Sequence, residues 1–496
     1  MNALCTFWGS AEKNLCRRLA CPNQSSVTVV FWTVSWRLLG GIIMTVRNIL
    51  GIPGLPGIAG TGALAHKLVL EHPHGDNKFE YDLAVVGLGP VGLRTLQKHC
   101  IYKDRMLGFD VSESRLAEVA SGSTSLTLLE NKRIAHAMDT HLLKLSANQA
   151  QLSKAAVVII CVPTELIEND APDYLPLRHA CNLVVNAASP GQLIVLTTTT
   201  YAGGTRELIV EPLRKRSLEP GIDIQVAFSP ERADTVLPHP INIHAPRLVG
   251  GYTNLCREAA VKFFGRGVVK VQRTNGLEAA EMTKLFETAY RAVNTALANE
   301  FAQACSAHDI SIAEVLDSAN LNPDDALGFT AGSGTGGYEL PFDPHHLLSQ
   351  SETYDVEFPV LEAAMASNKR RPSLVVERCA RVLADLGKEL SASKVLVIGL
   401  SNHTDTADLF GSPALAVMDL LLRSGADVGF HDHHFAGPII LGEFHVSGYP
   451  NPRDFGADLI FVHTVHTRLD LSWISNLDTV IDGTYRAKGL LNSVSL

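Results

Sequence analysis

A glycine pattern at residues 87–92 constrains the fold of this chain more than any other feature. Residues 81–92 are YDLAVVGLGPVG, an apolar run that ends in Gly-x-Gly-x-x-Gly and leads into a helical stretch. In a strand–loop–helix unit, Gly87 permits the tight turn, Gly89 lets a pyrophosphate approach the backbone, and Gly92 lets helix and strand pack closely. The helix that follows offers unpaired N–H groups to phosphate. The pattern predicts a dinucleotide-binding α/β unit.

An acidic residue indicates which dinucleotide fits. A second apolar run, residues 106–109, is followed by Asp110, eighteen residues after Gly92. A carboxylate at this place can hydrogen-bond both ribose hydroxyls and repels a 2′-phosphate. We therefore expect NAD rather than NADP. The alternative is an α/β turn that merely uses glycines, and the strand before the pattern and the helix after it argue against this.

Short apolar runs alternate with helical stretches from residue 81 onward, which predicts parallel sheets. Such strands are buried on both faces, so they are continuously apolar rather than alternating. The first set of runs is 83–86, 106–109, 157–162, 193–196 and 224–227, and a second set is 394–400, 428–432, 459–462 and 480–482. The predicted fold class is α/β, with two Rossmann-like domains whose parallel sheets are joined by a long central helix.

The predicted central helix covers residues 277–320, which contain no glycine or proline. A turn near 307–310 is expected to divide it. Its period places Ala280, Lys284, Glu287 and Arg291 on one side. The broad apolar stripe comprises Leu277, Leu285, Ala289, Ala292, Ala296 and Leu297. A glycine-dense loop follows at residues 328–337.

Length and charge limit the remaining possibilities. A chain of 496 residues predicts two or three domains, and the net charge of −9 disfavours a nucleic-acid binder because no basic surplus neutralises phosphates. Residues 27–46 resemble a poor signal anchor, but Arg37 lies within them and costs roughly 2.5 kcal/mol at a helix centre. We expect a dispensable leader with an alternative start near Met44, and a membrane anchor is the lesser alternative.

Cysteine and histidine spacing gives no metal prediction. The nine cysteines form no Cys-x-x-Cys pair, and their odd number in a large chain disfavours a disulfide framework, so a reducing cytoplasm is expected. Residues 431–434, HDHH, suggest a metal site at first sight. Because four consecutive residues cannot all face one point, a polar loop after a strand is the favoured interpretation, and we expect no metal.

Several motifs together resemble one family. Residues 81–496 are similar along their whole length to the UDP-glucose/GDP-mannose dehydrogenase family. The motifs, in order, are residues 110–115 (DVSESR), 161–164 (CVPT), 199–201 (TTY), 228–232 (FSPER), 278–287 (EAAEMTKLFE), 336–344 (GGYELPFDP) and 412–414 (SPA). The resemblance implies an NAD-binding N-terminal domain, a dimer-forming central helix and a C-terminal domain that holds the nucleotide. Gly399 would then open the C-terminal unit without a second NAD.

The resemblance sets the expected domain boundaries. Residues 1–80 form the leader, 81–275 the NAD-binding Rossmann domain, 276–390 the central helical dimerisation region with the glycine-rich active-site loop, and 391–496 the C-terminal Rossmann-like domain. A homodimer or higher homo-oligomer is expected through the central helix.

The chain departs from the family at the catalytic nucleophile. Family members oxidise a primary alcohol to a carboxylate in two hydride transfers, and the second requires a cysteine thiolate adduct. The family loop has Gly-Gly-His/Ser-Cys, whereas this chain has Glu339 at the cysteine position. No cysteine lies between Cys305 and Cys379, so none nearby in the sequence replaces it. The four-electron reaction is therefore expected to be lost.

Other departures affect the same chemistry. A family asparagine is Thr288 here, a glutamate is Thr197, and a lysine after Gly399 is His403. A family arginine is replaced in the stretch 410–411, and an Asp-Thr-Arg pattern is residues 482–484, DGT. Together these changes indicate an altered substrate, an altered reaction, or no reaction.

The residues that remain suit removal of an alcohol proton while hydride leaves carbon. By the resemblance, Lys284 is the catalytic lysine, Glu231 the conserved carboxylate, Thr199 the water-binding threonine and Asp343 the aspartate after the loop. Lys284 can stabilise an alkoxide, and Asp343 or Glu231 can take the proton if burial raises its pKa. Added candidates are Glu339 as a base and Tyr338 as a donor.

Each assignment has a structural alternative. Lys284 can be a solvated helix residue, Asp343 a turn residue before proline, Glu339 an exposed loop carboxylate and Phe329 a core residue. The resemblance implies cofactor contacts from Gly87, Gly89, Pro90, Val91, Gly92, Asp110, Arg115, Val162, Pro163, Thr164 and Thr199. It implies substrate contacts from Glu231, Arg232, Lys284, Thr288, Phe329 and Gly336.

The leading hypothesis is a single two-electron oxidation of a secondary alcohol to a ketone by NAD. A ketone has no further hydride to give, so no cysteine is needed. The hydroxyl can belong to the sugar of a nucleotide sugar or to the ribose of a nucleotide. The second resembles the ATP 3′-dehydrogenase step of aminonucleoside antibiotic pathways and is slightly favoured. The alternatives are an NAD-binding pseudoenzyme and a 6-dehydrogenase making a uronic acid with Glu339 in the nucleophile role.

Overall fold

The computed structural model describes residues 78–124, 126–231, 246–266, 270–319, 329–435, 437–474, 478–487 and 493–496. Residues 78–496 form one compact unit, separate from residues 1–77. The expectations for the leader, including the segment 27–46, and for Arg232 lie outside the described residues. Among the residues described, no helix is long and apolar enough to cross a membrane.

The first sheet has eight strands in the order β3-β2-β1-β4-β5-β6-β7-β8. They are β1 (Tyr81–Val86), β2 (Met106–Phe109), β3 (Leu143–Ser146), β4 (Ala155–Ile160), β5 (Leu193–Leu196), β6 (Gln225–Phe228), β7 (Arg247–Gly251) and β8 (Val271–Arg273). All neighbouring pairs are parallel except β6 and β7. The prediction of a parallel sheet is confirmed except at this one pair. The short strands β3, β7 and β8 were not predicted, because polar residues interrupt β3 and β8 and because β7 begins with an arginine and ends in two glycines.

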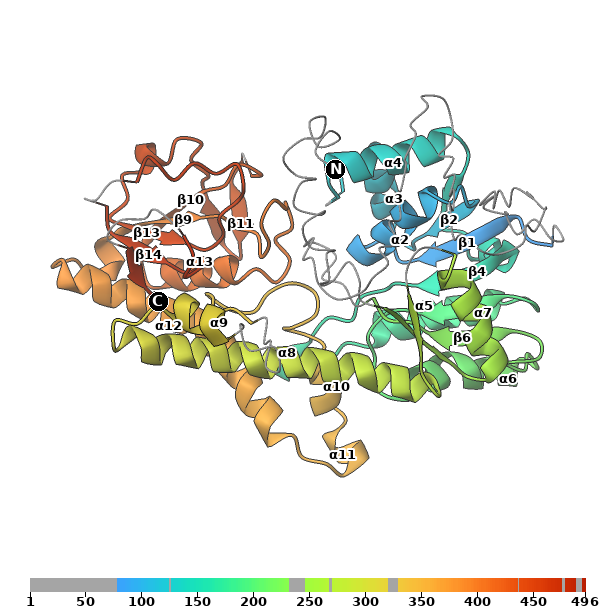
Figure 1. Ribbon diagram of the computed structural model, residues 1–496. Coiled ribbons are helices and arrows are strands. Elements are labelled where there is room, and N and C mark those ends of the chain that lie inside the picture. Colours follow the sequence, from blue (N-terminus) through green and yellow to red (C-terminus); the bar gives the residue numbers. More distant parts are fainter. Residues whose placement is uncertain are drawn as a thin grey trace, which may run out of the picture. The chain divides into compact units, whose positions relative to one another are not determined.

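Helices cover both faces of the first sheet (Figure 1). One core packs the sheet against α5 (Leu175–Ala187), the π-helix Arg206–Val210 and α6 (Glu211–Lys215). The other core packs it against α2 (Pro90–Cys100), α3 (Glu113–Ser121), α4 (Leu128–Asp139) and α7 (Asn254–Phe264). Burial on both faces explains why the central strands are continuously apolar.

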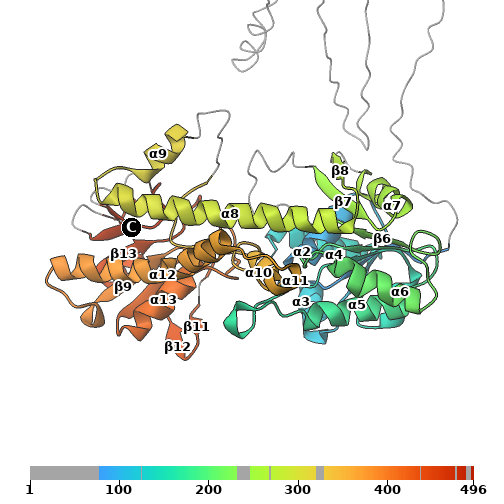
Figure 2. The same ribbon diagram turned by 90° about the horizontal axis from the view of Figure 1, so that it is seen from below.

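The predicted central helix is α8 (Leu277–Ser306), and α9 (Ile312–Ala319) follows after the expected break. α8 contacts β6 and β7 near its start and packs along α12 (Pro359–Asp385), as Figure 2 shows. The short helices α10 (Pro344–Leu348) and α11 (Ser351–Tyr354) precede α12. Of the predicted apolar stripe, Leu297 is exposed rather than buried.

The second sheet is wholly parallel, in the order β10-β9-β13-β14-β15. Its strands are β9 (Lys394–Ile398), β10 (Asp427–His431), β13 (Leu459–Val462), β14 (Val480–Asp482) and β15 (Ser493–Ser495). α12 and α13 (Pro413–Arg423) cover one face, and the hairpin β11 (Ile439–Leu441) and β12 (Phe444–Val446) lies beside β10. Four of these strands match the predicted runs to within two residues.

Candidate functional site

The glycine loop between β1 and α2 has the geometry that the pattern predicts. Gly87 has a φ of +88°, and a Cβ on Gly92 would lie 1.9 Å from the carbonyl oxygen of Gly87. Nothing lies within 4 Å of a Cβ on Gly89. Gly89 is the N-cap of α2 and no side chain caps this helix. The loop is closed where the protein must pack and open where a phosphate would bind.

Asp110 fixes the loop from the end of β2. Its Oδ2 accepts a hydrogen bond from the Leu88 N–H at 2.9 Å, and its Oδ1 accepts one from the Ser112 N–H at 3.0 Å. The Arg115 Nε–H donates to the Leu88 carbonyl at 2.9 Å. The predicted ribose-binding carboxylate therefore lies directly beside the phosphate loop.

The segment after β4 completes the cofactor side of the site. β1 and β4 are neighbours, and the chain leaves them for opposite halves of the sheet, which is the point where dinucleotides bind in such folds. Val162 contacts the glycine loop, because a Cβ on Gly87 would lie 2.9 Å from its Cγ2. The Thr164 hydroxyl is buried and has no hydrogen-bond partner in the described part of the chain. A buried hydroxyl without a partner fits a site that a polar ligand completes.

A cavity extends from this loop to the predicted catalytic residues. Its lining comes from the cofactor loops, from α8, from the segment 337–346 and from the loop after β9. The lining residues are Gly89, Pro90, Val91, Arg94, Cys161, Pro163, Thr164, Glu165, Thr197, Thr198, Thr199, Glu231, Lys284, Gly337, Tyr338, Glu339, Phe342, Asp343, His346, Asn402, His403, Asp408 and Phe410. All six predicted catalytic residues are among them.

A buried chain of charges lies in this cavity. The Lys284 Nζ is 2.7 Å from the Glu339 Oε1 and 3.6 Å from the Asp343 Oδ2. Glu339 also pairs with Arg291, and the Thr199 hydroxyl donates to the Asp343 Oδ2 at 3.1 Å. Lys284 is only 3% exposed. The alternative that it is a solvated helix residue is wrong, and so is that of an exposed Glu339, whose side chain is 15% exposed.

The two carboxylates of this network differ in their affinity for a proton. Burial raises the pKa of Glu339, but the charges of Lys284 and Arg291 outweigh burial and hold it below its usual value. Burial raises the pKa of Asp343 to about 7, against the attraction of Lys284. Burial lowers the pKa of Lys284, but Glu339 and Asp343 more than offset this and raise it. Asp343 is thus the group that can exchange a proton near neutrality, and Glu339 is not placed as a base.

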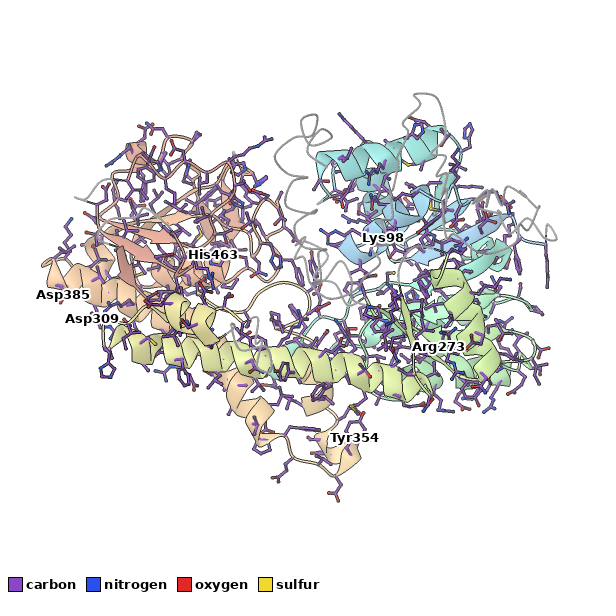
Figure 3. The ribbon with its side chains drawn as sticks, viewed as in Figure 1. Lys98, Arg273, Asp309, Tyr354, Asp385 and His463 are labelled. Carbon is purple, nitrogen blue, oxygen red and sulfur yellow. The ribbon has the colours of Figure 1, made fainter. Side chains whose placement is uncertain are left out.

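Glu231 is ionised and held by cations. Lys98, labelled on α2 in Figure 3, lies 3.0 Å from its Oε1, and Arg247 on β7 lies 2.6 Å from its Oε2. Burial opposes ionisation, yet Arg247 and Lys98 lower the pKa of Glu231 to about 2. The condition under which Glu231 was expected to take a proton, a pKa raised by burial, is therefore not met.

One cysteine does line the cavity, although none is close in sequence to Glu339. Cys161 follows β4, and its Sγ lies 3.2 Å from the Thr197 hydroxyl. Burial raises the pKa of this thiol to about 11. Since the thiolate is the nucleophile, Cys161 does not supply the missing group. The expectation that no nearby cysteine replaces the nucleophile is therefore unchanged, although it did not foresee a cysteine in the cavity lining.

An aromatic wall stands beside the charged network. The rings of Tyr338 and Phe410 stack with centroids 4.2 Å apart and planes at 2°, and Phe342 lies 5.3 Å from Phe410. The Tyr338 hydroxyl donates to the Asp408 Oδ1 at 3.2 Å. Burial raises the pKa of Tyr338 further above its usual value. Phe410 stands where the family arginine was expected, so a cation has been exchanged for an apolar face.

Three predicted substrate contacts lie outside the cavity lining. Thr288 is buried, and its hydroxyl donates to the carbonyls of Lys284 and Leu285 within α8. The ring of Phe329 packs against the ring of Tyr290, with 5.7 Å between the ring centroids. A Cβ on Gly336 would lie 2.3 Å from the Asn402 Oδ1, so this glycine allows close packing of two loops. The structure does not bring these three residues to the cavity.

Sequence reasoning did not assign to the site the cations that hold the carboxylates, although it placed Arg291 on the same side of the helix as Lys284. Arg291 lies seven residues after Lys284 on α8, which places both on one face, and this spacing was a usable signal. Lys98 and Arg247 come from α2 and β7 and meet Glu231 only through the folded sheet. No spacing in the sequence indicates that contact.

A second cavity of about 620 Å³ lies in the C-terminal half. Gly399 has a φ of +74°, and a Cβ there would lie 2.0 Å from the Thr464 carbonyl oxygen. Gly399 therefore resembles Gly87, which also follows a strand, has a positive φ and is closely packed. The cavity is lined by the glycine-dense loop, the loop after β9 and the C-terminal segment. Its lining residues include Gly332, Ser333, His403, His463 and Arg486.

Comparison with known proteins gives consistent matches. Residues 81–266 match the NAD binding domain of the UDP-glucose/GDP-mannose dehydrogenase family, and residues 278–370 match its central domain. The chain is 30% identical to the UDP-N-acetyl-D-mannosamine dehydrogenase of Pyrococcus horikoshii over 400 residues, covering 79% of this chain and 91% of that protein. It is also 30% identical to the enzyme of that name from Methanococcus maripaludis over 369 residues, 71% and 79% of the two chains. The solved structure of a UDP-D-ManNAc dehydrogenase from P. horikoshii superposes with a TM-score of 0.73 at 26% identity, covering 83% and 98%.

Proposed function

Since the chain belongs to the UDP-glucose/GDP-mannose dehydrogenase family, we propose that it oxidises one secondary hydroxyl of a nucleotide-linked substrate to a ketone, with NAD as hydride acceptor. The reaction removes two electrons and stops. The two relatives are named as dehydrogenases of a nucleotide sugar, UDP-N-acetyl-D-mannosamine. We extend a nucleotide-linked substrate from these relatives to this chain as part of the proposal.

One observation supports the single step above all others. Glu339 stands at the nucleophile position, and Lys284 and Arg291 hold it in ion pairs. A carboxylate in that state forms no stable adduct with an aldehyde. The Cys161 thiol in the same cavity stays protonated. Oxidation of a secondary alcohol needs no such adduct, because the ketone has no hydrogen left on the oxidised carbon.

The residues of the network have complementary roles in this reaction. Asp343 accepts the hydroxyl proton on its carboxylate, and its raised pKa suits transfer near neutral pH. The Lys284 ammonium stabilises the oxygen as negative charge develops there. Thr199 orients Asp343 through its hydrogen bond. NAD supplies the hydride acceptor, held by the glycine loop and Asp110.

The aromatic wall favours a nucleotide ribose as the oxidised group. In a ribose, the nucleobase is attached to the same ring as the reacting carbon, so a flat apolar surface is needed close to the catalytic groups. Tyr338 and Phe410 provide such a surface in the cavity that contains Lys284 and Asp343. A hydroxylated hexose would instead be served by charged and polar donors. We therefore propose the 3′-hydroxyl of a nucleotide such as ATP, and a nucleotide sugar is the second candidate.

We also propose that α8 forms a homodimer interface. Met282, Phe286, Tyr290, Leu297 and Phe301 are exposed on α8, and they recur at spacings of four and seven residues along one face. An exposed apolar stripe of this kind marks a protein interface, and a second copy presents the same stripe. The proposal keeps the domain boundaries at 81–275, 276–390 and 391–496. In the described residues the six cysteines are free, which fits a cytoplasmic enzyme.

A turnover panel tests the proposal. Purified protein is incubated with NAD and, in turn, with ATP, other nucleotides and nucleotide sugars, and NADH is measured by absorbance. NADH formation with a nucleotide, and a keto product by mass spectrometry, supports the ribose version. Turnover of nucleotide sugars alone supports the second candidate. NAD binding without hydride transfer across the panel indicates a pseudoenzyme and contradicts the proposal.

A further inference from the structure

Three side chains that can bind a metal lie together at one edge of the C-terminal sheet. Asp405 follows β9, His434 follows β10 and His466 follows β13, and these three strands are parallel neighbours with β9 in the middle. The carboxyl ends of parallel strands meet at one edge, so three distant segments converge there. One ligand atom of each residue lies within 4.8 Å of those of the other two.

We propose that Asp405, His434 and His466 bind a divalent transition-metal ion, with Zn²⁺ as the preferred ion. Two imidazole nitrogens and one carboxylate oxygen suit Zn²⁺. At Zn–ligand distances of about 2.0–2.1 Å, ligand atoms lie roughly 3.4 Å apart in a tetrahedron. Side-chain rotations that shorten the distances between ligand atoms from at most 4.8 Å, by up to about 1.4 Å, would reach this separation. The HDHH segment supplies one ligand, His434, and the other two ligands come from elsewhere in the chain.

His434 gives an independent indication that a ligand is missing from this place. Its Nε2 is sealed from solvent and has no hydrogen-bond partner among the residues described. Buried polar atoms are rarely left without a partner.

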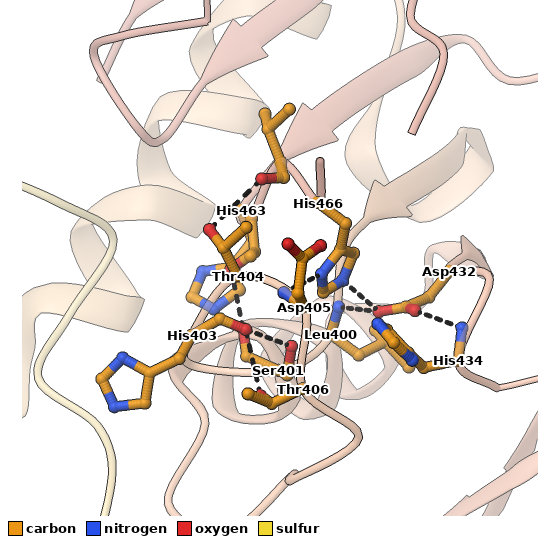
Figure 4. Close-up of polar contacts among 12 residues, drawn as sticks. Leu400, Ser401, His403, Thr404, Asp405, Thr406, Asp432, His434, His463 and His466 are labelled. Carbon is orange, nitrogen blue, oxygen red and sulfur yellow. Dashed lines mark hydrogen bonds and ion pairs between the residues drawn. The ribbon is translucent and has the colours of Figure 1, made fainter. Parts of the chain in front are cut away.

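His466 is already oriented as metal-binding histidines are. Its Nε2 lies 3.0 Å from the Asp432 Oδ2, and its Nδ1 accepts the Asp405 N–H at 2.9 Å (Figure 4). The proton is thus on Nε2, where a carboxylate holds it, and the lone pair is on Nδ1. A carboxylate behind a histidine ligand fixes its tautomer and strengthens the metal bond. Metal binding would exchange the Asp405 amide at Nδ1 for the ion, which the Asp405 carboxylate would also bind.

Zinc titration of the full-length protein tests this site without substrate or NAD, so the result does not depend on the proposed reaction. The protein is treated with a chelator, dialysed and titrated with ZnCl₂ by calorimetry, and Co²⁺ is used as a spectroscopic substitute. We expect one Zn²⁺ per chain and visible Co²⁺ bands of a low-symmetry site. His434→Ala should weaken binding by at least about 100-fold, since it removes a ligand, and Asp432→Asn by about 10–100-fold through His466.

A neighbouring histidine supplies the matched control. His433 is exposed, its ring centroid lies 4.0 Å from that of His434 with the planes tilted by 38°, and it does not belong to the ligand set. His433→Ala should bind Zn²⁺ as the unaltered protein does. His434 is only partly buried, so its variant should fold, and circular dichroism checks this. The proposal is overturned if no stoichiometric Zn²⁺ binds, if His434→Ala binds as tightly as the unaltered protein, or if His433→Ala loses binding to the same extent.

Discussion

The Lys284 ammonium lies 2.7 Å from the Glu339 carboxylate, inside the cavity that the cofactor loops line. In the family pattern the position of Glu339 is that of the nucleophilic cysteine. The substitution therefore does more than remove a sulfur atom, because it adds a negative charge that Lys284 and Arg291 neutralise. The ion pairs of Glu339 keep Lys284 and Arg291 in place. Asp343 is then the carboxyl group of this network whose pKa is near 7.

Glu339→Gln should destabilise the folded protein. It leaves the buried Lys284 without its nearest counter-charge, and breaking a buried ion pair costs about 3–5 kcal/mol. We expect the free energy of unfolding in urea to fall by that order. Glu352→Gln, on α11, is the matched control and should change it by less than about 0.5 kcal/mol. Equal stability of the two variants would show that the Lys284–Glu339 pair does not form.

Activity should fall below pH 7 because of Asp343. Burial raises its pKa to about 7, and only the ionised form accepts a proton. We expect kcat/KM to decrease tenfold per pH unit below about 7 and to level off above it. Asp343→Asn should reduce kcat by about 10²–10⁴-fold.

Glu231→Gln serves as the control for this pH limb. Arg247 and Lys98 lower the pKa of Glu231 to about 2 despite its burial, so it stays ionised throughout the range measured. The decrease of kcat/KM below about pH 7 should persist in Glu231→Gln even if the rate falls. Its disappearance there would assign the limb to Glu231.

Two glycines of the cofactor loop should respond differently to alanine. A Cβ on Gly92 would lie 1.9 Å from a backbone oxygen, whereas one on Gly89 meets no protein atom within 4 Å. Gly92→Ala should lower stability by about 1–3 kcal/mol or more through overpacking. Gly89→Ala should melt like the unaltered protein but lose NAD affinity, measured by calorimetry. Unchanged NAD affinity in Gly89→Ala would contradict pyrophosphate binding at this loop.

Phe286→Glu should dissociate the proposed dimer. Phe286 is 67% exposed on α8, and a charge there would be desolvated in an interface with a second copy. Light scattering after size exclusion should show a dimer for the unaltered protein and a monomer for the variant. Ile222→Glu changes an apolar residue outside α8 that is 78% exposed, and it should leave the dimer intact. A monomeric unaltered protein would refute the interface.

Local patterns predicted much of the fold. The glycine spacing at residues 87–92 has a direct geometric cause, and the apolar runs mark strands buried on both faces. The antiparallel strand β7 was missed because its sequence, RLVGG, begins with a cation and ends in two glycines. That cation, Arg247, enters the site from β7 and binds Glu231.

The site was predictable only where one element contributes several groups. Lys284 and Arg291 share a face of α8, so their proximity follows from helical spacing. The contacts of Cys161, Glu231 and His434 join segments separated by tens to hundreds of residues, and only the folded sheets bring them together. The environments that set the pKa of Asp343 and Glu339 likewise depend on burial, which the sequence does not specify.

The number of NADH molecules formed per substrate molecule consumed tests the central claim most directly. The product is quantified by mass spectrometry in the same reaction. One NADH and a ketone two mass units lighter than the substrate are expected, because Glu339 is held in ion pairs and the Cys161 thiol stays protonated. Two NADH and a carboxylate product would contradict the account.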